Sequence, residues 1–323
     1  MKGWVFRSSN QPIHCHSEAR RRHVSDCSGG FLLEEAIRKA GVLIEALPYI
    51  QSFRNKIVVI KFGGSAIDVG GDLSNLLTSL VFMSQVGMRP VLVHGGGPMI
   101  SAEMKRRGKS PQFVKGRRIT DRETLDIAES VLVDMVNRDL VESIWRLGGH
   151  SVGMHVRQHG CLFAEKLLIT DETGDTLDLG FVGRVTHIDA ARVRSFCDAG
   201  IIPVIAPLAK DCDSNTLNVN ADSAASTIAA QLKAEKVVFV ADVHGIMTDR
   251  KDDKSVLSSV NEEQIADLIR RGVITGGMQP KVEACLEAVR AGVKKAHIIN
   301  GNIPHSLLLE IFTDKGIGTE IVH

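Results

Sequence analysis

The sequence lacks any hydrophobic run long enough to cross a lipid bilayer. Its longest apolar stretches, Ile57–Ile60 and Val237–Ala241, are soon closed by charged residues or glycines. We therefore expect no membrane-spanning segment. A chain of 323 residues can instead bury a substantial hydrophobic core, and its length fits one two-lobed globular domain or two small ones.

Two features of nucleic-acid-binding proteins are also missing. The 39 basic side chains are balanced by 38 acidic ones, which leaves a net charge of +1, and aromatic residues make up only 4% of the chain. A polynucleotide partner favours a strong basic excess and aromatic stacking platforms. We expect no nucleic-acid partner.

Paired cysteines are absent as well. The six cysteines form no C-x-x-C pair, and a chain of this size needs no disulfides to fold. This pattern favours a reducing compartment, and we expect a cytoplasmic protein. The cysteines are Cys15, Cys27, Cys161, Cys197, Cys212 and Cys285.

Well-known nucleotide-binding motifs do not occur either. There is no G-x-x-x-x-G-K-[ST] sequence and no protein-kinase signature, and no G-x-G-x-x-G follows the first expected strand. These absences exclude P-loop kinases and protein kinases, and they argue against a dinucleotide-binding enzyme.

The first part of the chain differs in composition from the rest. Residues 1–29 are rich in Arg, Ser and His and are expected to form a disordered tail; the alternatives are an organellar transit peptide or a metal site. That metal site would use Cys15, His16, His23 and Cys27. Residues 30–55 show apolar positions at helical spacing and predict an amphipathic helix that Pro48 kinks or stops.

After residue 55, short β-branched runs alternate with helical patterns. Strands are expected at Ile57–Ile60, Val91–His94, Ser151–Val156, Ile202–Ile205, Val237–Ala241 and Ala296–Ile299. Helices are expected at Leu73–Gln85, Pro98–Arg107, Arg122–Leu147, Ala221–Leu232, Asn261–Arg271 and Lys281–Ala291. This alternation predicts an α/β protein, a three-layer α/β/α sandwich with a mostly parallel central sheet.

Two glycine clusters directly follow expected strands. One is Lys61-Phe-Gly-Gly-Ser65 and the other is His94-Gly-Gly-Gly-Pro98. Ligands of open parallel sheets bind where strands end, and glycines followed by a helix start favour phosphate oxygens. Lys61 ends an apolar strand, where a cation is costly unless an anion meets it.

Further charged residues stand at expected helix starts. Asp222 follows the Asn218-Val-Asn220 segment, where it is either a simple helix-start residue or an acid that orients lysines. Lys281 lies where the helix dipole disfavours a cation, which suggests an anionic ligand. Two lysines and one aspartate suffice for phosphoryl transfer, which needs cationic groups and positioning more than covalent chemistry.

Six motifs in the same order make the chain resemble the acetylglutamate kinases of the amino-acid kinase family. They are KFGGSA at 61–66, VHGGGP at 93–98, GRRITD at 116–121, NVNAD at 218–222, ADVHGI at 241–246 and GGMQPK at 276–281. The resemblance covers residues 31–323. It implies ATP-dependent phosphorylation of the γ-carboxylate of N-acetyl-L-glutamate in arginine biosynthesis, with Mg²⁺ carried by the nucleotide and no separate metal site.

The resemblance also implies roles for individual residues. Lys61 and Lys281 would stabilise the transferring phosphoryl group, and Asp222 would hold both lysines. Acceptor binding would fall to Gly64, Gly96, Gly97, Arg118 and Asn218. Nucleotide binding would fall to Lys61, Gly63, Asp242, Val243, His244, Gly245, Ile246, Met247, Gly276, Gly277 and Lys281. It also divides the core into an acceptor-binding and dimerising lobe, residues 56–233, and an ATP-binding lobe, residues 234–323, which also holds the arginine site.

Arginine-inhibited members of the family carry an N-terminal helix that joins dimers into a hexamer. The helix at 30–55 and the C-terminal segment resemble theirs, which implies a homohexamer and inhibition by L-arginine at Tyr49, His297, Glu310 and Gly316. The alternative is an ordinary C-terminal helix with a capped end.

One segment departs from the family pattern. The loop from Met154 to Cys161 lacks the family's acidic residue and carries His155, Arg157 and His159 instead. Acceptor identity therefore stays open between acetylglutamate and carrier-linked aminoadipate, aspartate, carbamate or UMP. A metal pair at His155 and His159, and a non-catalytic protein that binds arginine or nucleotide, are further alternatives.

Overall fold

The computed structural model describes residues 27–67, 73–170, 174–249, 252, 255–313 and 316–323. The chain divides into two compact units, one ending at Ala46 and one running from Leu47 to His323. Among the described helices, none is both long and apolar enough to cross a membrane.

The first helix, α1, extends from Cys27 to Phe53 and therefore belongs to both units. It begins at Cys27 rather than at residue 30. It also continues through Pro48, so the interpretation in which Pro48 stops the helix is wrong. The disordered tail and its alternatives, including Cys15, His16 and His23, fall on residues 1–26 and lie outside the described residues.

An eight-stranded sheet forms the centre of the second unit, with the strand order β12-β14-β13-β11-β1-β2-β8-β5. Within this sheet only the pair β13–β14 is antiparallel. The strands are β1 Ile57–Phe62, β2 Arg89–His94, β5 Ser151–Met154, β8 Ile202–Ile205, β11 Lys236–Ala241, β12 Ser259–Val260, β13 Lys295–Asn300 and β14 Thr319–Ile321.

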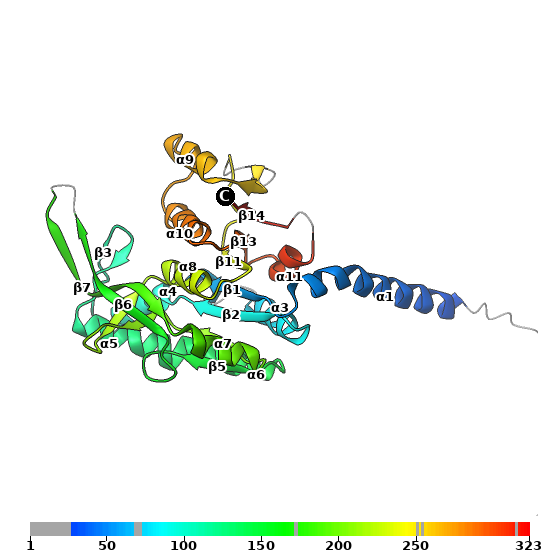
Figure 1. Ribbon diagram of the computed structural model, residues 1–323, viewed down its shortest axis with the longest axis horizontal. Coiled ribbons are helices and arrows are strands. Elements are labelled where there is room, and N and C mark those ends of the chain that lie inside the picture. The colour runs from blue at the N-terminus through cyan, green and yellow to red at the C-terminus, as the bar shows by residue number, and fades with distance from the viewer. Residues whose placement is uncertain (1–26, 68–72, 171–173, 250–251, 253–254, 314–315) are drawn as a thin grey trace, which may run out of the picture. The chain divides into compact units, whose positions relative to one another are not determined.

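Helices cover both faces of this sheet (Figure 1). Because side chains alternate along a strand, Val59 of β1 packs into one core while Val58 and Ile60 pack into the other. One face carries α7 Ala190–Asp198, α8 Ala221–Gln231, α9 Glu262–Arg270 and α10 Met278–Arg290. The other carries α3 Leu73–Gln85, α4 Gly97–Arg106, α5 Arg122–Glu129, η1 Ser130–Asn137, α6 Arg138–Arg146 and α11 Ser306–Ile311. The predicted three-layer sandwich is confirmed.

A small closed barrel was not predicted from the sequence. It joins β6 Leu162–Thr170, β7 Thr176–Ile188, β9 Leu208–Lys210 and β10 Thr216–Val219. The long β6–β7 pair contains two register shifts, which disrupt the simple alternation that would have revealed these strands. The short β3 Phe113–Val114 and β4 Arg117–Arg118 form a separate hairpin, and α2 spans Gly64–Ile67.

The helix expected at Arg122–Leu147 also differs from the prediction. Its middle, η1, has π-helical hydrogen bonding, and right-handed helical dihedral angles at Glu129, Ser130, Asn137 and Arg138 join it to its α-helical neighbours. A π-helical turn is wider than an α-helical one and is often found at functional sites. The hydrophobic pattern alone does not distinguish the two.

Strand register brings the glycine clusters together. Phe62 of β1 pairs with His94 of β2 on one side and with Val240 of β11 on the other. The three strands therefore end at the same edge of the sheet, where ligands of parallel sheets bind.

Candidate functional site

Two glycine turns meet at this edge. The Gly95 N–H donates to the Phe62 carbonyl at 3.0 Å, and the Gly63 N–H donates to the Val240 carbonyl at 3.1 Å. A Cβ atom on Gly64 would lie 2.5 Å from Pro98 Cδ, and one on Gly96 would lie 2.7 Å from Leu132 Cδ2. Only glycine lets the two turns pack this closely against each other and against η1.

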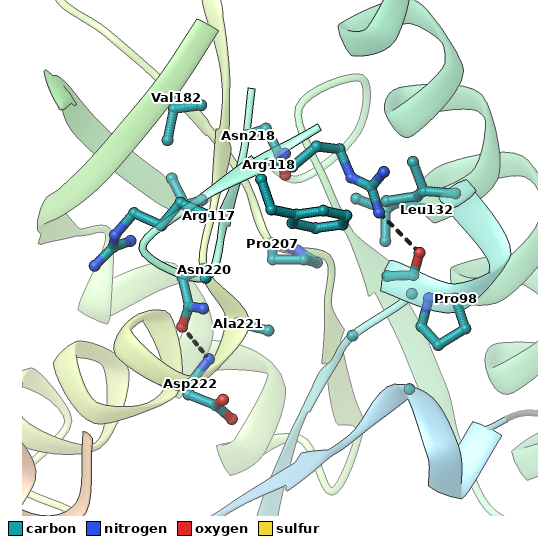
Figure 2. A pocket seen from close by; sticks show the side chains of 18 of the residues that line it. Pro98, Arg117, Arg118, Leu132, Val182, Pro207, Asn218, Asn220, Ala221 and Asp222 are labelled. Carbon is teal, nitrogen blue, oxygen red and sulfur yellow. Dashed lines mark hydrogen bonds between the residues drawn. The ribbon is translucent and has the colours of Figure 1, made fainter. Parts of the chain in front are cut away.

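A cavity of about 250 Å³ opens between these turns and the start of α8 (Figure 2). It gathers all five predicted acceptor-binding residues, Gly64, Gly96, Gly97, Arg118 and Asn218, together with Lys61 and Asp222. Sequence reasoning missed several of its other lining residues. These are Gly95, Pro98, Phe113, Arg117, Leu132 and Asn220.

Lys61 and Asp222 form a buried ion pair in this cavity. The ammonium Nζ lies 2.6 Å from Asp222 Oδ1, and both side chains are largely shielded from solvent. The Asn220 side chain caps α8 by accepting from the N–H groups of Asp222 and Ser223 at 2.9 and 3.0 Å. This cap fixes the first turn of α8 and thereby the position of the carboxylate.

Arg118 is a buried cation without a carboxylate partner among the described residues. Its guanidinium donates to the Gly97 carbonyl at 2.9 Å and to Ser101 Oγ at 2.8 Å, and it lies 4.7 Å from the centre of the Phe113 ring. Burial lowers its pKa from the ordinary value. A bound carboxylate would neutralise this charge, which suits Arg118 to an anionic acceptor.

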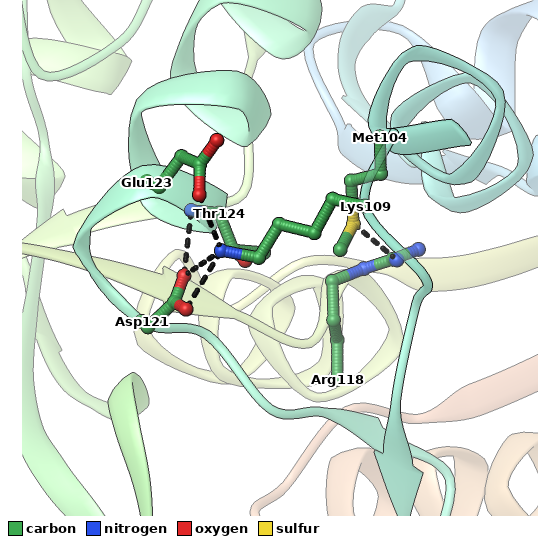
Figure 3. A network of polar contacts seen from close by, with 6 residues as sticks. All are labelled: Met104, Lys109, Arg118, Asp121, Glu123 and Thr124. Atoms are coloured by element: carbon green, nitrogen blue, oxygen red, sulfur yellow. Dashed lines mark hydrogen bonds and ion pairs between the residues drawn. The ribbon is translucent and has the colours of Figure 1, made fainter. Parts of the chain in front are cut away.

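A surface network holds the segment that carries Arg118 (Figure 3). Lys109 Nζ contacts both carboxylate oxygens of Asp121 at 2.7 Å and Glu123 Oε2 at 2.9 Å. The hydrogen bonds from Lys109 and Thr124 lower the pKa of Asp121 to about 2. Asp121 remains ionised and also caps α5 by accepting from the Thr124 N–H at 2.8 Å.

A second cavity, of about 450 Å³, lies between the end of β11 and the start of α10. Its lining includes the predicted nucleotide-binding residues Asp242, Val243, Gly245, Ile246, Met247, Gly277 and Lys281. Further apolar walls come from Val273, Ile274 and Met278, which the sequence prediction did not include. Apolar walls with a lysine at a helix start fit a base and a phosphate chain.

Four predicted nucleotide-binding residues do not line this cavity. One of them, Lys61, lines the acceptor cavity instead. The ring of His244 lies 3.4 Å from Asn300 Nδ2, Gly276 precedes the lining residue Gly277, and Gly63 belongs to the turn after β1.

A direct contact joins the helices that carry Asp222 and Lys281. The buried Ser226 Oγ on α8 donates to the Ala284 carbonyl on α10 at 2.7 Å. Cys285, one position further on, is buried next to both Asp222 and Lys281, and this burial raises the pKa of its thiol well above the ordinary value. The two cavities are therefore linked through α8 and α10.

The four predicted arginine-binding residues line a third cavity of about 340 Å³. Burial would raise the pKa of Glu310, but a 2.5 Å contact with His297 Nδ1 and the nearby Lys236 lower it to about 2. Gly316 has a φ of +61°, and a Cβ there would lie 2.7 Å from Glu310 Oε2. The sequence prediction missed Lys236, although a lysine beside a buried strand was the signal that identified Lys61.

The unusual loop from Met154 to Cys161 does not line the acceptor cavity. Its Arg157 pairs instead with Glu129 at 2.6 Å and with Asp134 at 2.7 Å, on α5 and η1. Among the described residues, no group of three or more His, Cys, Asp or Glu side chains is arranged to hold a metal ion.

Comparison with known proteins decides the family. Residues 56–300 match the Amino acid kinase family. The chain belongs to the amino acid kinase family. Curated relatives from Halothermothrix orenii and Heliobacterium modesticaldum, both named acetylglutamate kinase, are 46% identical to this amino acid kinase. The alignments cover 90% and 89% of this chain and 99% of each relative, which confirms the resemblance predicted from the motifs.

Solved structures of other proteins share the fold of this amino acid kinase. N-acetylglutamate synthase from Neisseria gonorrhoeae, complexed with coenzyme A and N-acetyl-glutamate, is 26% identical with a TM-score of 0.76; the match covers 88% of this chain but only 63% of the synthase. Carbamate kinase from Giardia lamblia bound to AMP-PNP is 16% identical with a TM-score of 0.60, over 83% of this chain and 98% of that one.

Proposed function

We propose that this amino acid kinase transfers the γ-phosphoryl group of ATP to the γ-carboxylate of N-acetyl-L-glutamate, a step of arginine biosynthesis. The observation that carries the proposal is the buried Arg118, which has no carboxylate partner among the described residues and lies in the same cavity as the Lys61–Asp222 pair. The curated relatives named acetylglutamate kinase support this choice of acceptor.

The reaction forms a bond between a carboxylate oxygen and the phosphorus atom and breaks the bond to ADP. We assign acceptor binding to the lobe of residues 56–233 and nucleotide binding to residues 234–323. Lys61 and Lys281 offset the negative charge that spreads over the phosphoryl oxygens, and Asp222 holds Lys61 in place. ATP supplies the phosphoryl group, and we propose that Mg²⁺ is held by its phosphates.

A panel of acceptors tests this function. Coupled measurement of ADP release with N-acetyl-L-glutamate, aminoadipate, aspartate, carbamate and UMP should give the highest kcat/KM with N-acetyl-L-glutamate. A higher value with another acceptor would reassign the substrate, and no turnover with any acceptor would leave only a regulatory binding role.

We also propose that L-arginine inhibits the enzyme from the third cavity, and that the enzyme is a cytoplasmic homohexamer. Glu310 is the one carboxylate among the four predicted arginine-binding residues, and a guanidinium pairs well with it. Glu310→Gln should raise the arginine concentration for half-inhibition by about tenfold or more and leave kcat within about threefold. An unchanged arginine response would exclude this cavity as the effector site.

A further inference from the structure

A buried histidine directly precedes the second glycine turn. His94 ends β2, has no exposed surface and precedes Gly95, Gly96 and Gly97. Burial is the main reason why the pKa of His94 is lowered to about 4, while its bond to Gly95 opposes that shift. The imidazole is therefore neutral at the pH of the cell interior and carries a single ring proton.

The neighbours of His94 decide which ring nitrogen carries this proton. Nδ1 lies 3.0 Å from the Gly95 carbonyl oxygen. A carbonyl oxygen can only accept, so Nδ1 carries the proton and donates it. Nε2 is then an acceptor, and it faces the side-chain nitrogen of Asn137 at 3.0 Å.

The orientation of the Asn137 amide is set in the same way. Its nitrogen also lies 2.9 Å from the Val204 carbonyl oxygen on β8, which again can only accept. Both hydrogens of the amide are therefore used, one towards Val204 and one towards His94 Nε2. This arrangement leaves His94 with one tautomer.

The wide turn of η1 and a glycine on β5 make room for the amide. Asn137 is the last residue of η1 and is buried, and a Cβ atom on Gly153 would lie only 2.3 Å from Asn137 Oδ1. The same π-helical segment packs against the glycine turn, because a Cβ atom on Gly96 would lie 2.7 Å from Leu132 Cδ2 and 3.7 Å from Val136 Cγ2.

The hydrogen bond from His94 orients the peptide between Gly95 and Gly96 at the acceptor cavity. It turns the Gly95 carbonyl towards the buried imidazole, and in a planar trans peptide the Gly96 N–H then points the opposite way. Gly95 and Gly96 both line the acceptor cavity with Lys61. Neither His94 nor Asn137 lines that cavity, so both act through the peptide.

We propose that Asn137 and His94 are positioning residues that fix the Gly95–Gly96 peptide so that its N–H faces the phosphoryl group during transfer. This inference rests on the proposed kinase function. It assigns a role to the π-helical segment and to the histidine of the VHGGGP motif, and it places both outside the ligand-contacting residues.

Two substitutions at His94 separate hydrogen bonding from packing. His94→Asn keeps an N–H donor near the position of Nδ1, whereas His94→Leu keeps the bulk and removes the donor. We expect His94→Leu to lower kcat on the order of a hundredfold with little change in the KM for ATP, and His94→Asn to recover at least about tenfold of that loss. Equal losses in two variants with wild-type-like thermal unfolding would overturn the proposal.

A substitution at Asn137 gives a second, independent readout. Asn137→Asp replaces the amide donor by a carboxylate, which can only accept a hydrogen bond when it is ionised. A neutral His94 would then donate its single ring proton to this carboxylate instead of to Gly95. One extra proton, shared by the carboxylate and the imidazole, is needed to keep the bond to Gly95. The kcat of this variant should therefore fall as pH rises, relative to wild type. His155 is the titratable group whose charge acts on His94, and burial and Arg157 lower the pKa of His155. His155 is present in both proteins, so its effect cancels in the comparison.

Gln231→Glu is the matched control. Gln231 also donates its amide to a backbone carbonyl, that of Thr186 at 3.0 Å, but it lies away from the glycine turns. Its pH–rate profile should run parallel to that of wild type. A parallel profile for Asn137→Asp would overturn the proposal. The ratio of variant kcat to wild-type kcat can be measured with whichever acceptor the enzyme uses. Failure of the proposed function would appear in the wild-type acceptor panel alone.

Discussion

Lys61, Asp222 and Lys281 illustrate what single residues contribute to this enzyme. Lys61 and Asp222 form a buried pair, and Lys281 lines the adjacent cavity at the start of α10. A cation at a helix start is unfavourable unless an anion compensates for it. The position of Lys281 is therefore better explained by a bound phosphate group than by the stability of the apo fold.

Replacing Lys281 by Met tests the proposed role of this lysine. We expect kcat to fall about a hundredfold or more, because one charge that stabilises the transition state is lost, whereas the affinity for ATP should change little. Steady-state kinetics and nucleotide titration measure the two quantities. Lys233→Met, at an exposed lysine outside both cavities, is the control, and a kcat of Lys281→Met within about threefold of wild type would contradict the role.

His94 predicts a pH dependence of stability. Its folded pKa of about 4 lies below the ordinary value of 6.5, so the unfolded chain binds more protons between these values. Stability from this residue is complete above pH 6.5 and is lost as pH falls towards 4, by at most about 1.4 kcal/mol per pH unit.

Urea unfolding of wild type and His94→Asn between about pH 7 and pH 4.5 measures this dependence. The free energy of unfolding should fall less steeply with acidification in His94→Asn, because the titrating imidazole is absent. Identical slopes in the two proteins would show that His94 is not the group that titrates.

At the scale of elements, α8 and α10 determine how the two cavities face each other. The hydrogen bond from Ser226 to Ala284 crosses between these helices, and Asp222 and Lys281 lie about one turn before its two ends. A shift of one helix along the other would separate the charged groups that phosphoryl transfer needs close together.

Ser226→Ala should lower the free energy of unfolding by about 1 kcal/mol, because the hydrogen bond from the Ser226 hydroxyl to the Ala284 carbonyl is lost. It should also lower kcat, measured as ADP release. Thr227→Ala is a close control, since the Thr227 hydroxyl bonds within α8, to the Ser223 carbonyl at 3.1 Å. Equal effects on kcat in both variants would mean that the inter-helix bond has no special role.

At the scale of the whole molecule, α1 is notable for its exposed large apolar side chains. Leu33, Ile37 and Ile44 lie on one face of the helix and are all more than half exposed. A helix with an exposed apolar stripe is typical of an interface between chains. This supports the role in oligomerisation that the family resemblance implies for α1.

Deleting residues 1–46 removes this stripe but keeps Tyr49 and Phe53 of the third cavity. We expect light scattering to show a change from hexamer to dimer, while kcat stays within about threefold because neither substrate cavity is touched. Inhibition by arginine should be lost if it acts through the assembly. An unchanged mass would refute the role of α1.

The sequence alone determined the layered α/β architecture and pointed to the edge of the sheet where the predicted site residues lie. Regular hydrophobic periods identify strands and helices locally, and glycines, lysines and an aspartate at strand ends identify the ligand edge. The helix α3, Leu73–Gln85, was predicted at these residues because its hydrophobic period is a local signal.

Only the tertiary structure decided three other features: the barrel, the π-helical turn and the surroundings of His94. Strand partners of the barrel come from separate segments with register shifts, and the eight residues of η1 are too few for the longer π-helical period to show in the hydrophobic pattern. The tautomer of His94 depends on Gly95, the next residue, and on Asn137 and Val204, which reach it only when β2, η1 and β8 pack. Such contacts have no signature along the chain.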